Sequence, residues 1–211
     1  MTKIKICGIK NVKEAEYLNK AKVDYAGLVF HGQSKRNVTV DEAKEIIKAL
    51  DAGIKKVAVT VSPDTDTVKE LANLGFDILQ VHDELSKEVI RTSTIPIWYA
   101  CNISDKNRLS EMLVFRDLLS EEEKSKITGI VMDAPEYGSG KTFDWNAESV
   151  SGFGSESLEL ILAGGLNAEN VEEGIELFNP DIVDVSTGVE GEDGKDEEKI
   201  MRFVEIVRNV R

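Results

Sequence analysis

Eight short apolar segments that alternate with longer amphipathic segments predict an α/β protein, a (β/α)8 TIM barrel that forms a single domain over residues 1–211. The chain leaves about 26 residues for each of eight units, which suits a strand, a crossover helix and two short loops. No Pro-rich or repetitive stretch divides it. A doubly wound sheet is the competing architecture, but its glycine-rich loop follows the first strand. Here the glycine-rich turns follow the sixth, seventh and eighth predicted strands.

The predicted strands are the short apolar runs. In chain order they cover residues 3–7, 25–30, 56–61, 77–81, 95–100, 127–133, 158–163 and 181–186. The first run alternates strictly, with Lys3, Lys5 and Cys7 on one face and two isoleucines on the other. We expect the isoleucines to pack under helices, so that Lys5 and Cys7 point into the barrel.

The predicted helices are the amphipathic segments between these strands, in which apolar residues recur every three or four positions. Asp41 is placed to cap the second helix. We expect helices over residues 12–20, 40–50, 65–74, 87–92, 106–119, 168–178 and 197–210, and the helical pattern is weakest over 146–152.

The net charge of −13 argues against a nucleic-acid partner, because a phosphate backbone requires clustered cations. The excess is local, since residues 148–198 hold 15 Asp and Glu but one Lys, Lys195. No segment approaches the roughly eighteen apolar residues of a membrane helix, and the first ten residues do not resemble a signal sequence. We expect a cytoplasmic protein without a membrane partner. Cys7 and Cys101 are too few for a disulfide framework and lack metal-ligand spacing, so we expect reduced thiols.

Several predicted strands end in a titratable side chain. The C-terminal ends of barrel strands meet at one rim, which carries the functional residues of such barrels. Four strands supply such side chains there: Lys5 with Cys7, His82, Asp133 and Asp184. A lysine inside a barrel requires an anionic partner. Structural alternatives stay open, with Cys7 as a packed thiol, Asp133 as a turn or cap residue and His82 as a hydrogen-bonding residue of the framework.

Two glycine-rich turns follow the seventh and eighth predicted strands. The first contains Gly164 and Gly165, and the second contains Ser186, Thr187 and Gly188. Glycine lets the backbone approach a ligand, and helix N-termini present free N–H groups with a partial positive charge. Turns at these two places form the usual phosphate site of such barrels.

The acidity around these turns bears on how they would bind a phosphate. We expect backbone amides and helix ends, rather than lysine and arginine side chains, to hold it. Lys195 is the one cation within residues 148–198. Lys141, in the glycine-rich segment 137–145, is the nearest candidate from elsewhere, and the alternative for that segment is a solvated surface loop.

Eight motifs occur in order along the chain. They are K-I-C-G-I at 5–9, G-L-V-F with S-K-R within 27–36, V-H at 81–82, M-D at 132–133, G-S-G-K-T-F-D-W at 138–145, A-G-G-L at 163–166, V-D-V-S-T-G-V-E at 183–190 and G-K-D at 194–196. Together they closely resemble the phosphoribosylanthranilate isomerase family, which is built on a (β/α)8 barrel. The resemblance spans residues 3–196.

The resemblance implies an Amadori rearrangement in tryptophan biosynthesis. The ribosyl ring of N-(5-phosphoribosyl)anthranilate opens and becomes the 1-deoxyribulose 5-phosphate derivative, without a metal or an organic cofactor. By this resemblance Asp133 is the acid that protonates the ring oxygen, and Cys7 is the base that removes the C2 proton. Arg36 matches the arginine that engages the anthranilate carboxylate, an anion whose two oxygens suit a guanidinium.

The roles implied by the resemblance also suggest functions for the other candidate residues. Burial or a carboxylate such as Asp184 favours a protonated Asp133, and the cation on Lys5 favours a thiolate at Cys7. We therefore expect Lys5, Cys7 and Asp184 to form one electrostatic group. Lys5, Asp184 and His82 join Arg36 as substrate-binding candidates. The residues that match the family's phosphate cradle are Gly164, Gly165, Ser186, Thr187 and Gly188.

Several positions depart from the common family pattern, among them Lys35, Asp83, Ala58 and Thr60, and the strand that ends WYACN at 98–102 is unlike the family. Lys35 replaces the proline of S-P-R, Asp83 replaces the glycine of Q-L-H-G, and Thr60 replaces the phenylalanine of V-G-V-F. The change at Thr60 is expected to remove an aromatic side chain beside the anthranilate.

Two other functions are possible alternatives: a related isomerase and a non-catalytic binding protein. The ProFAR isomerase of histidine biosynthesis performs an equivalent rearrangement on a substrate with two phosphates, but it uses two aspartates and a second phosphate loop in its first half. A non-catalytic phosphosugar-binding barrel would not need both Cys7 and Asp133. Either a monomer or a homodimer fits the sequence, because exposed and dimer-buried helix faces have the same pattern.

Overall fold

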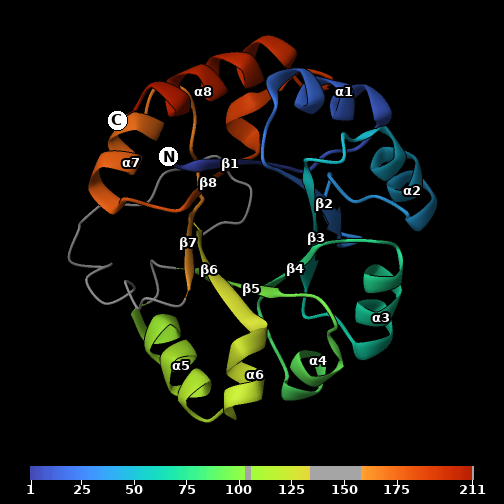
Figure 1. Ribbon diagram of the computed structural model, residues 1–211, viewed down its shortest axis with the longest axis vertical. Helices are drawn as coiled ribbons and strands as arrows, with labels where there is room; N and C mark the ends of the chain where they lie inside the picture. Colours follow the sequence, from blue (N-terminus) through green and yellow to red (C-terminus); the bar gives the residue numbers. More distant parts are fainter. Residues whose placement is uncertain (103–105, 134–157, 211) are drawn as a thin grey trace.

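The chain folds into a closed barrel of eight parallel strands, β1 to β8 in chain order, with helices around it (Figure 1). This computed structural model describes residues 1–102, 106–133 and 158–210. The strands are β1 (Lys3–Cys7), β2 (Tyr25–Phe30), β3 (Lys55–Val61), β4 (Ile78–His82), β5 (Ile97–Asn102), β6 (Ile127–Asp133), β7 (Glu159–Leu162) and β8 (Ile182–Val185). The predicted (β/α)8 barrel is confirmed, and β8 closes it by pairing with β1.

The helices follow the predicted ones closely, with one addition. They are α1 (Val12–Ala21), α2 (Val40–Ala49), α3 (Thr65–Asn73), α4 (Lys87–Thr92), α5 (Lys106–Asp117), α6 (Glu121–Lys126), α7 (Val171–Phe178) and α8 (Glu197–Asn209). The addition is α6, whose short, mostly charged sequence has no apolar repeat. It begins with a capping box, in which Ser120 Oγ accepts from the Glu123 N–H and the Glu123 carboxylate accepts from the Ser120 N–H. The predicted helix over 146–152 and Lys141 lie outside the described residues.

One predicted helix cap and one predicted helix start are wrong. Thr39, not Asp41, caps α2, because Thr39 Oγ1 accepts from the Glu42 N–H and the Glu42 carboxylate accepts from the Thr39 N–H. Helix α7 begins at Val171 rather than at residue 168. The residues before it form a turn in which the Asn167 N–H donates to Asn170 Oδ1 at 2.8 Å.

Apolar side chains fill two layers. Ile4 and Ile6 of β1 lie in the layer between the strands and the helices, as alternation predicts. The interior layer contains Tyr25 and Trp98, whose ring centroids are 5.1 Å apart, with Val57, Ile78, Val131, Ile161 and Ile182. Because these bulky side chains fill the barrel towards the N-terminal ends of the strands, the interior polar side chains gather towards the C-terminal ends.

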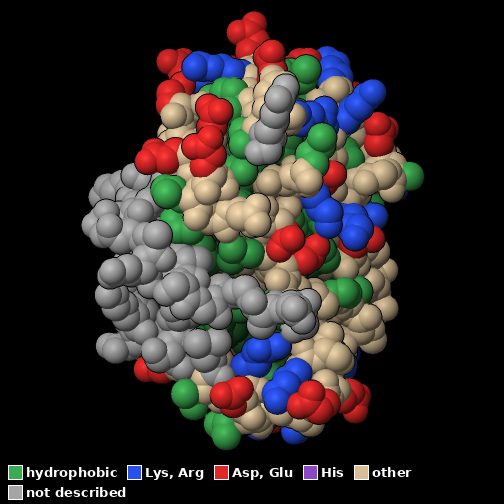
Figure 2. All heavy atoms as spheres, turned by 60° about the vertical axis from the view of Figure 1, so that its left-hand side comes forward, with side chains coloured by type: hydrophobic (Ala, Val, Ile, Leu, Met, Phe, Trp, Pro, Cys, Tyr) green, Lys and Arg blue, Asp and Glu red, His purple; other side chains and the backbone are tan. Residues whose placement is uncertain are grey.

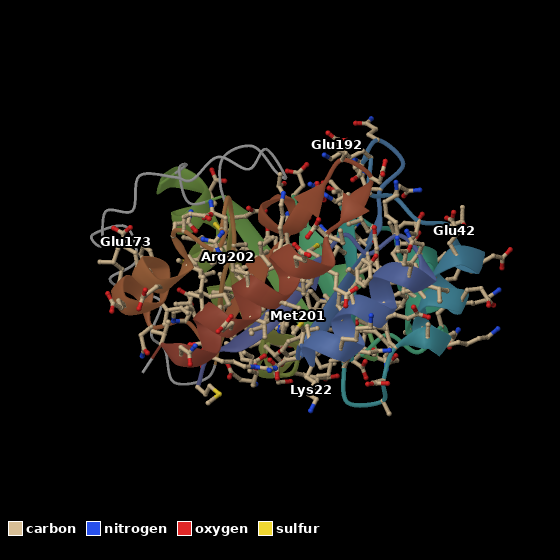
Figure 3. All side chains as sticks on the ribbon, turned by 90° about the horizontal axis from the view of Figure 1, so that it is seen from above. Lys22, Glu42, Glu173, Glu192, Met201 and Arg202 are labelled. Atoms are coloured by element: carbon tan, nitrogen blue, oxygen red, sulfur yellow. The ribbon has the colours of Figure 1, made fainter. Side chains whose placement is uncertain are left out.

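A short hairpin that the sequence did not predict follows β8. After the 3-10 helix η2 (Thr187–Val189), strands β9 (Glu190–Gly191) and β10 (Gly194–Lys195) pair antiparallel. Glu14 of α1 holds this hairpin, since its carboxylate accepts from the Lys195 N–H at 3.1 Å and from the Lys10 N–H at 2.7 Å. In the side view of Figure 3, Glu192 of the hairpin lies at the edge of the molecule opposite Lys22, which precedes β2. The hairpin therefore lies on the C-terminal rim.

The surface carries charges of both signs. On the face shown in Figure 2, acidic and basic side chains are interspersed rather than separated into large areas of one sign. No helix in the described part of the chain has the length and apolar character needed to cross a membrane.

Candidate active site

Lys5 and Asp184 form a buried ion pair inside the barrel. Their Cα atoms are register partners on β1 and β8, and Lys5 Nζ donates to Asp184 Oδ2 at 2.6 Å. The Lys5 side chain is fully buried. Burial alone would lower the pKa of Lys5, but the Asp184 carboxylate and the Cys7 sulfur together outweigh it and raise this pKa. The anionic partner that the sequence required for Lys5 is therefore Asp184.

The Cys7 thiol completes this group. A Cβ atom at Gly27 of β2 would lie 3.0 Å from Cys7 Sγ and 3.1 Å from Lys5 Nζ, so the glycine leaves the space in which the two side chains meet. Burial raises the pKa of the Cys7 thiol, and the Lys5 and Lys195 ammoniums act in the opposite direction without cancelling it. Lys5, Cys7 and Asp184 therefore form one electrostatic group, and Lys5 favours the thiolate as expected, but burial has the larger effect and keeps the thiol protonated.

His82 ends β4 on the same interior face as Gln80. The two side chains are joined by a hydrogen bond of 2.9 Å between Gln80 Nε2 and His82 Nε2. Because an amide nitrogen only donates, His82 Nε2 accepts, and a neutral imidazole then carries its proton on Nδ1. Burial, assisted by the Lys5 cation, lowers the pKa of His82 to about 3. The residue is a neutral hydrogen-bonding group.

Asp133 is the last residue of β6, opposite Asn102 at the end of β5. Alternation places its side chain on the interior face, with that of Val131. It is half-buried. Cys101, in contrast, lies in the layer under the helices, so the sequence interpretation of Cys101 as a packing residue is confirmed.

Arg36 is bound to a carboxylate of the protein itself. Its Nε donates to Glu190 Oε1 at 2.6 Å and its Nη2 to Glu190 Oε2 at 3.0 Å. Nη2 also donates to Thr187 Oγ1 at 2.9 Å, which joins Arg36 to the turn after β8. A Cβ atom at Gly8, whose φ is +84°, would overlap Cδ of Arg36. Gly8 thus lets the arginine side chain lie directly against the turn after β1.

The two glycine-rich turns touch each other. Gly164 and Gly165 both adopt left-handed backbone conformations, with φ of +81° and +71°. A Cβ atom at Gly188 would overlap the Leu166 carbonyl oxygen, so only glycine allows the second turn to approach the first this closely. The structure therefore brings the predicted phosphate-binding glycines together at the ends of β7 and β8.

The Ser186 hydroxyl is already engaged within the protein. It donates to the Cys7 carbonyl oxygen at 2.9 Å, and Lys195 Nζ donates to Ser186 Oγ at 3.1 Å and to the Ser186 carbonyl at 2.9 Å. Lys195 also donates to Glu190 Oε1 at 2.9 Å. The side chain of Lys195 is thus tied to the frame of the turn.

Sequence reasoning missed four residues of this arrangement. They are Gly8, Gly27, Glu190 and Lys195, of which the sequence analysis named Lys195 only as a nearby cation. All four lie in motifs quoted above, but the motif letters do not show which side chains meet. Within the described residues no group of three or more His, Cys, Asp or Glu side chains is placed to hold a metal ion.

The family model described as N-(5'phosphoribosyl)anthranilate (PRA) isomerase matches residues 4–206 of the chain. The chain belongs to this family. A relative from Thermoanaerobacter sp. (strain X514), named N-(5'-phosphoribosyl)anthranilate isomerase, is 40% identical over the full length of both proteins. The expected resemblance to phosphoribosylanthranilate isomerases is therefore confirmed.

Solved structures of this isomerase family share the fold of the whole chain. One is a monomeric form of the dimeric enzyme from Thermotoga maritima, with a TM-score of 0.82, 30% identity and 99% of both chains covered. Another is a family member in complex with reduced 1-(o-carboxyphenylamino)-1-deoxyribulose 5-phosphate, with a TM-score of 0.81, 27% identity and the same coverage.

The structure gives physical reasons for two departures from the common family pattern. Thr60 lies beside Val81 on the helix-facing side of the sheet, and its hydroxyl donates to the Gln80 carbonyl. The expectation that its substitution alters the anthranilate site is therefore wrong. Asp83 has a φ of +68°, a left-handed conformation that explains why glycine is common there and that aspartate tolerates better than most residues.

Proposed function

We propose that the chain is an N-(5'-phosphoribosyl)anthranilate isomerase, which carries out the Amadori rearrangement of tryptophan biosynthesis. The observation that carries the proposal is the family match over residues 4–206, combined with Cys7 and Asp133 at the ends of two barrel strands. The C-terminal ends of parallel strands meet at one rim, where barrel enzymes hold their substrates. An acid from β6 and a base from β1 then act on the same sugar.

In the proposed mechanism Asp133 is the general acid. It donates its proton to the ribose ring oxygen, the bond between C1 and that oxygen breaks, and the anthranilate nitrogen lone pair forms an iminium at C1. The carboxylate left on Asp133 regains its proton from solvent.

Cys7 is the general base of the next step. Its thiolate removes the proton from C2, which converts the iminium into an enolamine. The enolamine then takes up a proton at C1 and loses the proton of the C2 hydroxyl, which gives the ketone. Since burial raises the pKa of Cys7, the Lys5 ammonium is needed to keep its thiolate accessible.

Binding is assigned to the other rim residues. Arg36 binds the anthranilate carboxylate, and Lys5, His82 and Asp184 face the sugar. The phosphate lies on the glycine-rich turns, at Gly164, Gly165, Ser186, Thr187 and Gly188. For Ser186 the proposed donor is its backbone N–H, because its hydroxyl hydrogen is already donated to Cys7. This role requires no lysine or arginine at the phosphate.

We also propose how many domains, which partners and which cellular location this activity requires. One domain, no cofactor and no nucleic-acid partner suffice for this chemistry. Cys7 needs a free thiol to act as a base, which favours the reducing cytoplasm. A homodimer is compatible with the dimeric Thermotoga maritima relative, and a monomer is the alternative.

The test is a comparison of two substrates with the purified wild-type chain. We expect turnover of phosphoribosylanthranilate and no turnover of ProFAR, because strand β1 ends in Cys7 instead of the aspartate that ProFAR isomerases use there. Turnover of ProFAR alone, or of neither compound, contradicts the proposal.

A further inference from the structure

Glu190 lies at the centre of a group of cations beside the candidate active site. Its side chain is only 14% exposed, although β9 is at the rim. Three cations converge on it: Arg36 at 2.6 Å, Lys195 at 2.9 Å and Lys35 at 3.5 Å. Burial alone would raise the pKa of Glu190, but the hydrogen bonds from Arg36 and Lys195 lower it to about 2. Glu190 is therefore ionised throughout the neutral pH range.

We propose that Glu190 is a positioning residue that holds the Arg36 guanidinium by one edge, so that Nη1 is the donor left for the substrate carboxylate. This inference rests on the proposed function, in which Arg36 binds that carboxylate. Both atoms of the edge formed by Nε and Nη2 donate to Glu190, and the second Nη2 hydrogen goes to Thr187. Among the described residues, no hydrogen bond is made by Nη1.

The geometry fixes the plane of the guanidinium as well as its position. Two parallel hydrogen bonds to one carboxylate prevent rotation about the bonds at the end of the side chain. Gly8 leaves room for the same side chain, because a Cβ atom at Gly8 would overlap the arginine Cδ. A guanidinium that is already oriented loses less conformational entropy when the substrate binds.

The charges around Glu190 also favour a role in holding Arg36. Burial, with a smaller contribution from the Arg36 cation, lowers the pKa of Lys195, and the Glu190 carboxylate opposes both. Three cations around one carboxylate leave a net positive charge, which suits a second carboxylate from the substrate. Without the charge on Glu190, Arg36 and Lys195 repel each other and the orientation of Arg36 is lost.

The test measures ligand binding, so that it is independent of turnover. The probes are reduced 1-(o-carboxyphenylamino)-1-deoxyribulose 5-phosphate, which carries the carboxylate, and ribulose 5-phosphate, which lacks it. Calorimetric Kd values are compared for wild type, Glu190→Gln and Glu192→Gln. Glu192 is an exposed carboxylate in the same hairpin and serves as the matched control (Figure 3).

We expect Glu190→Gln to raise the Kd of the carboxylate probe about tenfold, as for the loss of a hydrogen bond to a charged group. The Kd of ribulose 5-phosphate and both values for Glu192→Gln stay at the wild-type level. In an Arg36→Met background, Glu190→Gln changes the Kd of the carboxylate probe by about twofold or less, because it acts through Arg36. Glu190→Asp, which keeps the charge but is shorter, gives an intermediate Kd and replaces Glu190→Gln if that variant does not fold.

An unchanged Kd for the carboxylate probe in Glu190→Gln, or an equal loss for both probes, overturns this inference alone. A full effect in the Arg36→Met background also overturns it. Wild-type protein that binds the carboxylate probe but does not turn over phosphoribosylanthranilate contradicts the proposed function and leaves the positioning of Arg36 standing. Wild-type protein that does not bind this probe contradicts both.

Discussion

Lys5 and Asp184 meet at 2.6 Å inside the barrel, where the lysine has no exposed surface and the aspartate has 7%. The two residues come from the first and the last strand, and their pairing closes the barrel at the level of the candidate active site. A buried pair of this kind holds its geometry but depends on both partners, because either charge alone would be left without solvation. Stability and the proposed chemistry therefore depend on the same contact.

Lys5→Met should destabilise the fold by about 3–5 kcal/mol at neutral pH, because it leaves the Asp184 carboxylate buried without its cation. The double variant Lys5→Met/Asp184→Asn should recover a large part of this loss. In the single variant, burial keeps the folded-state pKa of Asp184 above its unfolded value, so stability should increase as the pH falls towards 5. Urea denaturation at pH 8 and pH 5 measures both effects. A double variant as unstable as the single one would show that the pair is not the cause.

The Lys5 ammonium should also govern the titration of the Cys7 thiol. Removing it leaves burial unopposed by its nearest cation, so the pKa of Cys7 should move further up. We expect the iodoacetamide reaction of Cys7, followed in a Cys101→Ala background, to shift to higher pH in Lys5→Met. The alkaline rise of kcat/KM that disappears in a Cys7 variant should shift with it. An unchanged apparent pKa of Cys7 in Lys5→Met would show that Lys5 does not control the titration of the thiol.

A side chain at position 8 should weaken substrate binding, because it displaces Arg36. Gly8→Ala places a methyl group that overlaps Cδ of Arg36 and forces alanine into a left-handed conformation. We expect KM for phosphoribosylanthranilate to rise about tenfold or more, with a smaller change in kcat, because the proposed role of Arg36 is substrate binding. Gly53→Ala is the matched control, since a Cβ atom there meets open space. A wild-type KM in folded Gly8→Ala would show that the Arg36 position tolerates displacement.

His82 should stay neutral over the whole physiological range. Its folded-state pKa of about 3 lies below the ordinary value of 6.5, so the unfolded chain binds a proton that the folded chain does not. Its contribution to stability is therefore complete above pH 6.5 and is lost progressively as the pH falls towards 3. Nitrogen NMR should show a proton on Nδ1 alone at pH 6, and His82→Asn should lose less stability than wild type between pH 7 and pH 5. A doubly protonated imidazole at pH 6 would refute this.

The sequence predicted the barrel because eight strands repeat one simple pattern, and it placed Lys5 and Cys7 inside because alternation along β1 is strict. It did not predict α6, whose charged residues lack an apolar repeat and whose start depends on a local capping box. Nor did it predict the pairing of Arg36 with Glu190, because 154 residues separate them and only the closed barrel brings them together.

The protonation state of the Cys7 thiol could not be predicted from the sequence. The neighbouring cation was predictable from the alternation of β1, but the extent of burial was not, and burial has the larger effect on the thiol. A similar limit applies to Thr60, whose side of the sheet depends on the register of β3 against β4.

In the proposed mechanism, Asp133 and Cys7 act as acid and base on phosphoribosylanthranilate. The most direct measurement is the turnover of this substrate by wild type, Asp133→Asn and Cys7→Ala at equal concentrations of folded protein. We predict turnover by wild type and a loss of about 10²–10⁴-fold in kcat for each variant, the usual contribution of general acid or base catalysis. Equal turnover by wild type and Asp133→Asn would contradict the catalytic assignment.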